Sequence, residues 1–275
     1  MTATAFALAI AAAALHAAWN LVVKASGDRL VAAAAQAVFG GVAFLPFLLA
    51  GGLPHGGVTP ALASSVCHVA YYLALVRSYR ATDLSVAYPV ARGTAPLLVA
   101  AGSIVFVDDD LTALGWIGIA VVSLALLSIG LHVRDLTHLA WPLATGVVIA
   151  TYTLVDAHGI RTTGERMAYV SLLFALTPLW LVPLVVNRRG ARAVRAAVRR
   201  DGWRLAVAGV ASVTSYTLVL LAAARSAVGP VAAVRESSVV FAVLGGGLLL
   251  HEDVGTRRVA AAVGVACGAV VLAFA

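Results

Sequence analysis

The sequence predicts an all-α integral membrane protein with ten transmembrane helices, arranged as two inverted five-helix repeats. Three observations support this: the chain is 62% hydrophobic and 11% charged, its apolar residues fall into long runs, and its two halves match loosely. A soluble domain carries about 25% charged residues, and a spanning helix needs about 20 mostly apolar residues. We expect ten spans at 3–23, 30–51, 61–79, 84–106, 112–131, 139–158, 168–187, 203–223, 228–250 and 256–275.

Each run is expected to be a helix rather than a strand. Transmembrane strands would show segments of about 10 residues with alternating polarity, whereas these runs are apolar on every side and rich in alanine and leucine. The run at 3–23 lacks a basic lead-in and a convincing cleavage site. It is therefore expected to be the first spanning helix and not a signal peptide.

The net charge of +7 is concentrated beside the membrane. Seven arginines fall in the connection between the seventh and eighth runs: Arg188, Arg189, Arg192, Arg195, Arg199, Arg200 and Arg204. Basic connections are typical of the cytoplasmic side, where they attract anionic lipid headgroups. We therefore expect membrane lipid as a partner and no nucleic acid, in a multi-pass protein of the cell's inner (plasma) membrane.

The same charge rule predicts an orientation. Connections after even-numbered runs hold only three basic residues, Arg161, Arg166 and Arg225, together with the acidic stretch 108–110. Connections after odd-numbered runs hold Lys24, Arg29, Arg77, Arg80, Arg134, the arginine cluster, Arg257 and Arg258. This asymmetry predicts that the odd connections are cytoplasmic and that both termini are outside.

An internal repeat is visible at an offset of 143 residues, where 91–111 aligns with 234–254 and places Arg92 on Arg235. Five spans per half is an odd number, so the second copy enters the membrane in the opposite direction. Inverted repeats are common in secondary transporters, whose sites lie near the midplane between the halves. The predicted repeats cover 1–131 and 139–275.

Charged residues within the apolar runs are the main candidates for function. Arg92 and Arg235 lie well inside their runs, Glu236 follows directly, and Asp156 lies in the sixth run. A central arginine costs at least about 2.5–3.5 kcal/mol, so each needs a partner or a hydrated cavity. We expect Arg92 to pair with Glu236 and Arg235 with Asp156. Purely structural ion pairs are the alternative to substrate binding by the arginines and proton coupling by Glu236 or Asp156.

Polar residues at helical spacing extend this site. In the first run His16 and Asn20 are four residues apart, with Trp19 beside them. Tyr152 lies four residues before Asp156, and Tyr88 four before Arg92. Such pairs share a helix face, so we expect His16, Trp19, Asn20, Tyr88 and Tyr152 to line a cavity. Packing and hydrogen bonding between helices is the alternative. Pro89 and Pro96 around Arg92 are expected to bend or break that helix.

Motifs of enzymes and of ATP-driven transport are absent. The chain has no P-loop, no HExxH motif and no GxSxG motif, and the Cys and His spacing fits no metal site. The triplet His251–Asp253 ends a run and is expected to be a solvated helix end. We therefore expect no enzyme activity, no metal and no cofactor.

Four stretches resemble the ten-helix EamA branch of the drug/metabolite transporter superfamily. They are LHAAWNLVVK (15–24), residues 71–96, YTLVDAHG (152–159) and residues 234–253, which run to the acidic Glu252. The resemblance covers the whole chain as two EamA-like repeats. It implies a small-molecule carrier, often an exporter, with a central cavity between the halves. The charge pattern departs from the family's usual arrangement, in which both termini are cytoplasmic.

The sequence thus favours a secondary transporter, and a probable exporter, of a small anionic or zwitterionic metabolite by alternating access. A proton-coupled carrier of organic cations or drugs is the alternative, with Glu236 or Asp156 as the binding carboxylate. A lipid-modifying enzyme would need a catalytic cluster at headgroup level, and a structural membrane protein would have little need for matched arginines. Because one chain holds both repeats, we expect a monomer or a weak homodimer.

Overall fold

The computed structural model describes residues 1–24, 28–130, 136–245 and 255–275, and the regular elements in this part of the chain are all helices. Within this part, nine helices are long and apolar enough to cross a membrane. The protein is therefore a multi-pass helical membrane protein. In chain order the elements are α1 (Ala3–Lys24), α2 (Arg29–Gly51), α3 (Val58–Ala81), α4 (Leu84–Phe106), α5 (Ala113–Gly130), the 3₁₀ turn η1 (Leu136–Leu139), α6 (Ala140–Thr162), α7 (Arg166–Arg189), α8 (Ala191–Ala223), α9 (Val228–Arg235), α10 (Ser238–Leu244) and α11 (Thr256–Ala273).

The eighth helix differs from its prediction. It begins at Ala191, directly after Gly190, and not near residue 203. Gly190 has a φ of 82°, a conformation that ends α7 and that glycine adopts without strain. The alanines and arginines that follow are good helix formers. The arginine-rich stretch is therefore mostly helical, with exposed side chains, and is not a loop.

The ninth predicted run contains a break. It forms two helices, α9 and α10, joined at Glu236 and Ser237. The amides of these two residues donate to the carbonyls of Ala233 and Val234, both at 3.0 Å, so each bond reaches back three residues. This is 3₁₀ geometry, which turns successive side chains further apart than an α-helix does. The break therefore changes where Arg235 and Glu236 point.

The expected break in the fourth run does not occur. Helix α4 continues through both Pro89 and Pro96. Each proline removes one backbone hydrogen bond, and neighbouring helices can compensate for such a loss in a membrane bundle. The interruption lies instead in the ninth run, where two charges precede Ser237 and Ser238, and serine is a weaker helix former than alanine.

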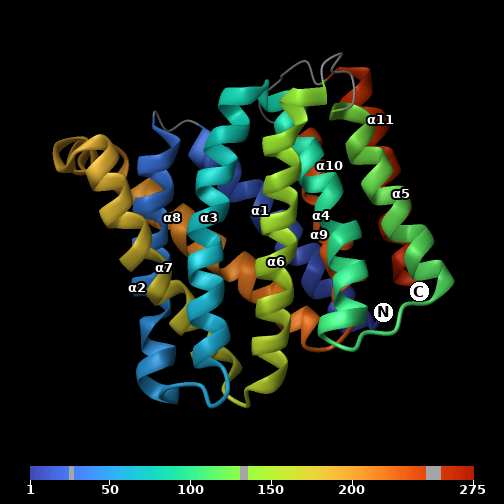
Figure 1. The fold of residues 1–275 in the computed structure, drawn as a ribbon, viewed down its shortest axis with the longest axis horizontal. Helices are drawn as coiled ribbons and strands as arrows, with labels where there is room; N and C mark the ends of the chain where they lie inside the picture. Colours follow the sequence, from blue (N-terminus) through green and yellow to red (C-terminus); the bar gives the residue numbers. More distant parts are fainter. Residues whose placement is uncertain (25–27, 131–135, 246–254) are drawn as a thin grey trace.

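The helices pack side by side with their ends at two levels (Figure 1). Helix α1 packs on α8, α3 on α6, α2 on α7 and α8, α4 on α5, α6 and α9, and α5 on α11. We call the level at which α1, α3, α5 and α7 finish the basic end, because it carries the arginines of α8. The opposite level is called the terminal end, because both chain termini lie toward it (Figure 1).

Glycines allow the closest of these helix contacts. A Cβ on Gly40 of α2 would overlap the backbone of Gly209 in α8, and a Cβ on Gly209 would overlap the Gln36 carbonyl. In α5 and α11, Gly118 and Gly268 meet in the same way. Small residues at such crossings let helices approach closely in a membrane.

Candidate functional site: a central cavity

A cavity of about 780 Å³ lies among the helices and extends toward the basic end. It reaches the exposed residues Asp83 and Arg258, at the basic-end starts of α4 and α11, and its inner part includes His68 and Arg235. The volume lies within the range of about 300–1,000 Å³ that small-molecule sites occupy. The bundle therefore contains a site that is large enough for a metabolite and that extends to one side.

The structure brings together all seven residues that the sequence suggested for substrate binding. The cavity lining includes His16, Trp19, Asn20, Tyr88, Arg92, Tyr152 and Arg235. The two carboxylates proposed for proton coupling, Glu236 and Asp156, are not among the lining residues and lie behind them. The functional roles of all nine stay predictions.

Arg92 and Glu236 form the buried ion pair that the sequence suggested. The Nε atom of Arg92 lies 2.8 Å from Oε2 of Glu236, with side chains 5% and 4% exposed. The two atoms are in ion-pair contact without the alignment of a hydrogen bond, and Nη2 of Arg92 also has no hydrogen-bond partner. The guanidinium carbon lies 5.8 Å from the centre of the Tyr88 ring. Arg92 is therefore neutralised, but part of its hydrogen-bonding capacity is unused.

Arg235 does not pair with Asp156 as expected. Its guanidinium carbon lies 5.4 Å from the centre of the Tyr216 ring. Its side chain is about nine-tenths buried, and its Nε has no hydrogen-bond partner. Within the described residues it has no carboxylate at ion-pair distance. The tyrosine face stabilises the cation only partly.

Asp156 is held by two tyrosines in place of Arg235. Its two carboxylate oxygens accept hydrogen bonds from the hydroxyls of Tyr169, at 2.7 Å, and Tyr216, at 2.6 Å. The Asp156 side chain is fully buried. Gly159 makes this arrangement possible, because a Cβ there would overlap the Tyr169 ring. The three helices α6, α7 and α8 are tied together beneath the cavity.

The first helix adds a further unpartnered donor. The His16 and Trp19 rings meet edge to face with centroids 5.0 Å apart. The indole Nε1 of Trp19 is buried without a hydrogen-bond partner. The side-chain amide of Asn20 donates to the carbonyl of His16 at 2.8 Å. Within the described chain, the buried side-chain nitrogens that have no hydrogen-bond partner all belong to Trp19, Arg92 and Arg235.

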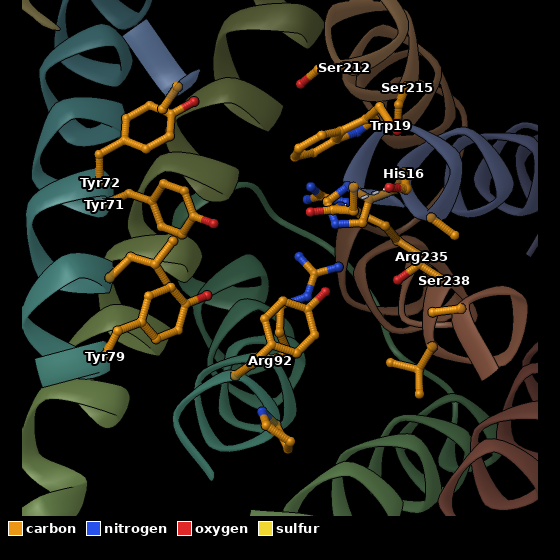
Figure 2. A pocket seen from close by; sticks show the side chains of 18 of the residues that line it. His16, Trp19, Tyr71, Tyr72, Tyr79, Arg92, Ser212, Ser215, Arg235 and Ser238 are labelled. Atoms are coloured by element: carbon orange, nitrogen blue, oxygen red, sulfur yellow. Dashed lines mark hydrogen bonds between the residues drawn. The ribbon is translucent and has the colours of Figure 1, made fainter. Parts of the chain in front are cut away.

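Sequence reasoning missed the contribution of α3. One face of this helix lines the cavity with His68, Tyr71, Tyr72, Leu75, Val76 and Tyr79. Figure 2 shows Tyr71, Tyr72 and Tyr79 on one side of the pocket and Arg235, His16 and Trp19 on the other. The spacing of three and four residues along 68–79 was visible in the sequence as an aromatic stripe. Aromatic stripes are common in packed cores, so the spacing alone did not indicate a cavity.

A polar cluster around Arg161 joins helix tips at the terminal end. Arg161 donates to Asp109 at 2.8 Å and to the carbonyls of Val107, Ala223 and Ser226 at 3.2, 2.9 and 2.8 Å. The second oxygen of Asp109 accepts from the amide of Val228 at 2.6 Å. We call these residues the Arg161 cluster. It joins the terminal-end tips of α4, α6, α8 and α9.

A smaller polar contact lies on the surface of the same end. The Glu165 carboxylate accepts from the Thr163 hydroxyl at 3.0 Å and from the His55 amide at 3.2 Å. The Thr163 hydroxyl, followed by the His55 contacts, lowers the pKa of Glu165 below its ordinary value. This contact links the α2–α3 and α6–α7 connections.

Several residues of interest lie outside the described part of the chain. They are the triplet at 251–253 and the side chain of Lys24. The expectation of a solvated helix end at His251–Asp253 therefore stays a prediction.

Comparison with known proteins identifies the fold. No protein-family model matches the sequence, and no curated protein matches it either. The chain is similar to a solved structure titled only "Crystal structure of protein", with a TM-score of 0.75 and 15% identity. The match covers 98% of this chain and 96% of that one. At this identity the similarity shows a shared fold and nothing about the substrate.

Proposed function

We propose that the protein is a secondary transporter of the EamA-like type, which moves a small anionic or zwitterionic metabolite by alternating access. The observation that carries this proposal is the set of unpartnered nitrogens of Trp19, Arg92 and Arg235 around one cavity. Buried donors normally have partners, and an unmade hydrogen bond costs about 1–3 kcal/mol. A carboxylate or phosphate-like group would satisfy these donors and pair with the cation of Arg235.

The pairing of helices supports a two-fold arrangement of two repeats. If the chain holds two repeats, α1 corresponds to α6 and α3 corresponds to α8. The α1–α8 contact then corresponds to the contact between α6 and α3, and the structure contains both. The α2–α7 and α5–α11 contacts are each unchanged when the halves are exchanged. Transporters of this architecture alternate by rocking one repeat against the other around a midplane site.

The shape of the cavity supports export. The cavity extends to the basic end, whereas the Arg161 cluster ties the helix tips together at the terminal end. The positive-inside rule makes the basic end cytoplasmic. The described state would then load substrate from the cytoplasm. Glu236, in contact with Arg92, is the favoured proton-coupling residue, because substrate and proton could compete for the same arginine.

The organic-cation alternative has less support. It requires a carboxylate that faces the cavity, but Glu236 is paired with Arg92 and Asp156 accepts two tyrosine hydrogen bonds. Neither residue lines the cavity. A cationic substrate would instead meet two guanidinium groups.

The test is transport by purified protein in liposomes, with Arg235→Gln as the diagnostic variant. Radiolabelled amino acids, organic acids and phosphonates would be offered with and without a pH gradient. We expect uptake of at least one anion or zwitterion by the wild-type protein and at least a tenfold loss in Arg235→Gln. The thermal stability of the variant should stay close to that of the wild type. Arg235 has no ion-pair partner in the described structure, so its removal leaves no buried carboxylate without a cation. Transport restricted to cations would overturn the proposal.

A further inference from the structure

Tyrosines are concentrated around the cavity. Six of the seven tyrosines in the chain line it. They are Tyr71, Tyr72, Tyr79, Tyr88, Tyr152 and Tyr216. Four of them, Tyr71, Tyr72, Tyr79 and Tyr88, are only partly buried, so core packing does not use their whole surface. Their rings present flat apolar surface to the volume that the arginines also face.

Four of these rings, those of Tyr71, Tyr72, Tyr152 and Tyr216, form a continuous wall. The Tyr71 ring lies 5.3 Å from that of Tyr72 and 5.9 Å from that of Tyr152, with interplanar angles of 56° and 77°. Tyr152 in turn lies 6.0 Å from Tyr216, the ring beneath Arg235. Aromatic rings favour offset or edge-to-face contacts at such distances, which add about 0.5–1.5 kcal/mol beyond simple burial. A flat aromatic ligand would extend this network.

The charged residues of the cavity favour a substrate that carries one carboxylate and no amine. Of the two arginines, Arg92 is already paired with Glu236, so only Arg235 lacks an acidic partner among the described residues. One carboxylate matches this single cation, and a second negative charge would remain uncompensated. An α-amino acid would bring its ammonium within a few ångströms of the same guanidinium, and the described residues offer no unengaged carboxylate deep in the cavity. Among those residues, the one acidic side chain in the lining is that of Asp83, which is exposed at the mouth, as is Arg258.

The cation of Arg235 and the tyrosines of α3 lie on opposite sides of the cavity. Arg235, His16 and Trp19 lie on one side in Figure 2, and the α3 tyrosines lie opposite. A molecule that spans the gap therefore needs an acidic group at one end and a flat apolar body at the other. We propose that the substrate class of this site is an aromatic monocarboxylate, with its carboxylate at Arg235 and its ring against Tyr71 and Tyr152. This inference rests on the proposed transport function and specifies the substrate.

The experiment compares five probes of similar size in binding to the purified protein at pH 7.4 and in uptake by proteoliposomes. The reference is 3-phenylpropionate, an aromatic monoanion. The other four each change one property: 3-cyclohexylpropionate has a saturated ring, phenylalanine adds an ammonium, phenylsuccinate adds a second carboxylate, and phenethylamine replaces the acid by a cation. We expect 3-phenylpropionate to bind at least tenfold more tightly than phenylalanine, phenylsuccinate or phenethylamine. We expect a three- to tenfold preference over 3-cyclohexylpropionate.

Two variants connect the preferences to residues. Arg235→Gln should reduce the binding of both propionates at least tenfold. Tyr71→Leu should lower the affinity for 3-phenylpropionate more than that for 3-cyclohexylpropionate, removing most of the difference. Phe47→Leu is the matched control, because Phe47 is an exposed aromatic residue that does not line the cavity. It should leave both affinities unchanged.

The outcomes separate this inference from the transport proposal. Equal or tighter binding of phenylalanine or phenylsuccinate, or of the saturated ring, would overturn the aromatic monocarboxylate while leaving transport of anions or zwitterions intact. Transport of organic acids or phosphonates that lack a ring, without transport of 3-phenylpropionate, would do the same. Binding and transport of phenethylamine alone would overturn both proposals.

Discussion

The terminal end and the central cavity use arginine in opposite ways. At the terminal end, Arg161 forms an ion pair with Asp109 and donates to three backbone carbonyls. In the cavity, Arg92 and Arg235 are more deeply buried, yet both have guanidinium nitrogens without partners. An arginine whose donors are all hydrogen-bonded within the protein stabilises the fold. A buried arginine with unpaired donors can still form hydrogen bonds with a ligand. Arg161 is the least buried of the three, yet it makes the most hydrogen bonds, and these bonds join helix tips at the terminal end.

The largest effect on stability should come from Arg161→Ala. The substitution leaves Asp109 without its cation and three carbonyls without their donor, so we expect a loss of about 4 kcal/mol. Thermal unfolding of the purified protein measures it. Arg225→Ala is the control, because Arg225 lies at the same end, is exposed and donates only to the carbonyl of Leu221, four residues earlier. If the two variants unfold alike, the Arg161 cluster does not hold the terminal end together.

The Arg92–Glu236 pair should be costly to break but replaceable. Arg92→Leu strands the Glu236 carboxylate in a buried position, which we expect to cost about 3 kcal/mol. Adding Glu236→Leu removes that stranded charge and should recover most of the lost stability, since apolar residues can replace a buried ion pair. Transport should stay abolished in the double variant. Recovery of transport together with stability would show that the pair is only structural.

The tyrosine network around Asp156 should show an intermediate effect. Tyr169→Phe removes one hydrogen bond to a buried carboxylate, which we expect to cost about 2 kcal/mol. Gly159→Ala should destabilise in the same direction, because its methyl group would displace the Tyr169 ring. Combining the two should cost less than their sum, since both act on one contact. Additive losses in thermal unfolding would mean that Gly159 acts through other neighbours.

The smallest effect should be the pH dependence from Glu165. Its pKa is lowered in the folded protein, so its contribution to stability is present above its unfolded pKa of about 4.3 and disappears as pH falls through the folded value. Glu165→Gln should therefore unfold slightly earlier than wild type at neutral pH, and the difference should vanish below about pH 4. Because Glu165 is solvent-exposed, the shift should be small and should shrink further in high salt. An undiminished difference at pH 3 would assign the effect to something other than this carboxylate.

The sequence was most informative where a single physical requirement dominates. Nearly every helix boundary followed from the length of apolar runs, because a bilayer requires about 20 apolar residues per span. Because a charge in hydrocarbon is energetically costly, Arg92, Arg235 and Glu236 were identified as candidate functional residues. The same cost predicted that Arg92 needs a partner, and the structure confirms Glu236 in that position. Helical spacing placed His16, Trp19 and Tyr88 on the cavity correctly.

The tertiary structure decided what depends on the arrangement of helices that are distant in sequence. Three helices meet at Asp156, so only the fold could show that Tyr169 and Tyr216 bind it in place of Arg235. The backbone break at Glu236 depends on local hydrogen bonding that apolar periodicity does not register. In the sequence, the α3 tyrosines have the spacing of ordinary core residues. Only the packing of the facing helices shows that a cavity lies in front of them. Hydropathy thus determined that this chain spans the membrane many times, because that property is local, whereas the cavity was decided by packing between helices.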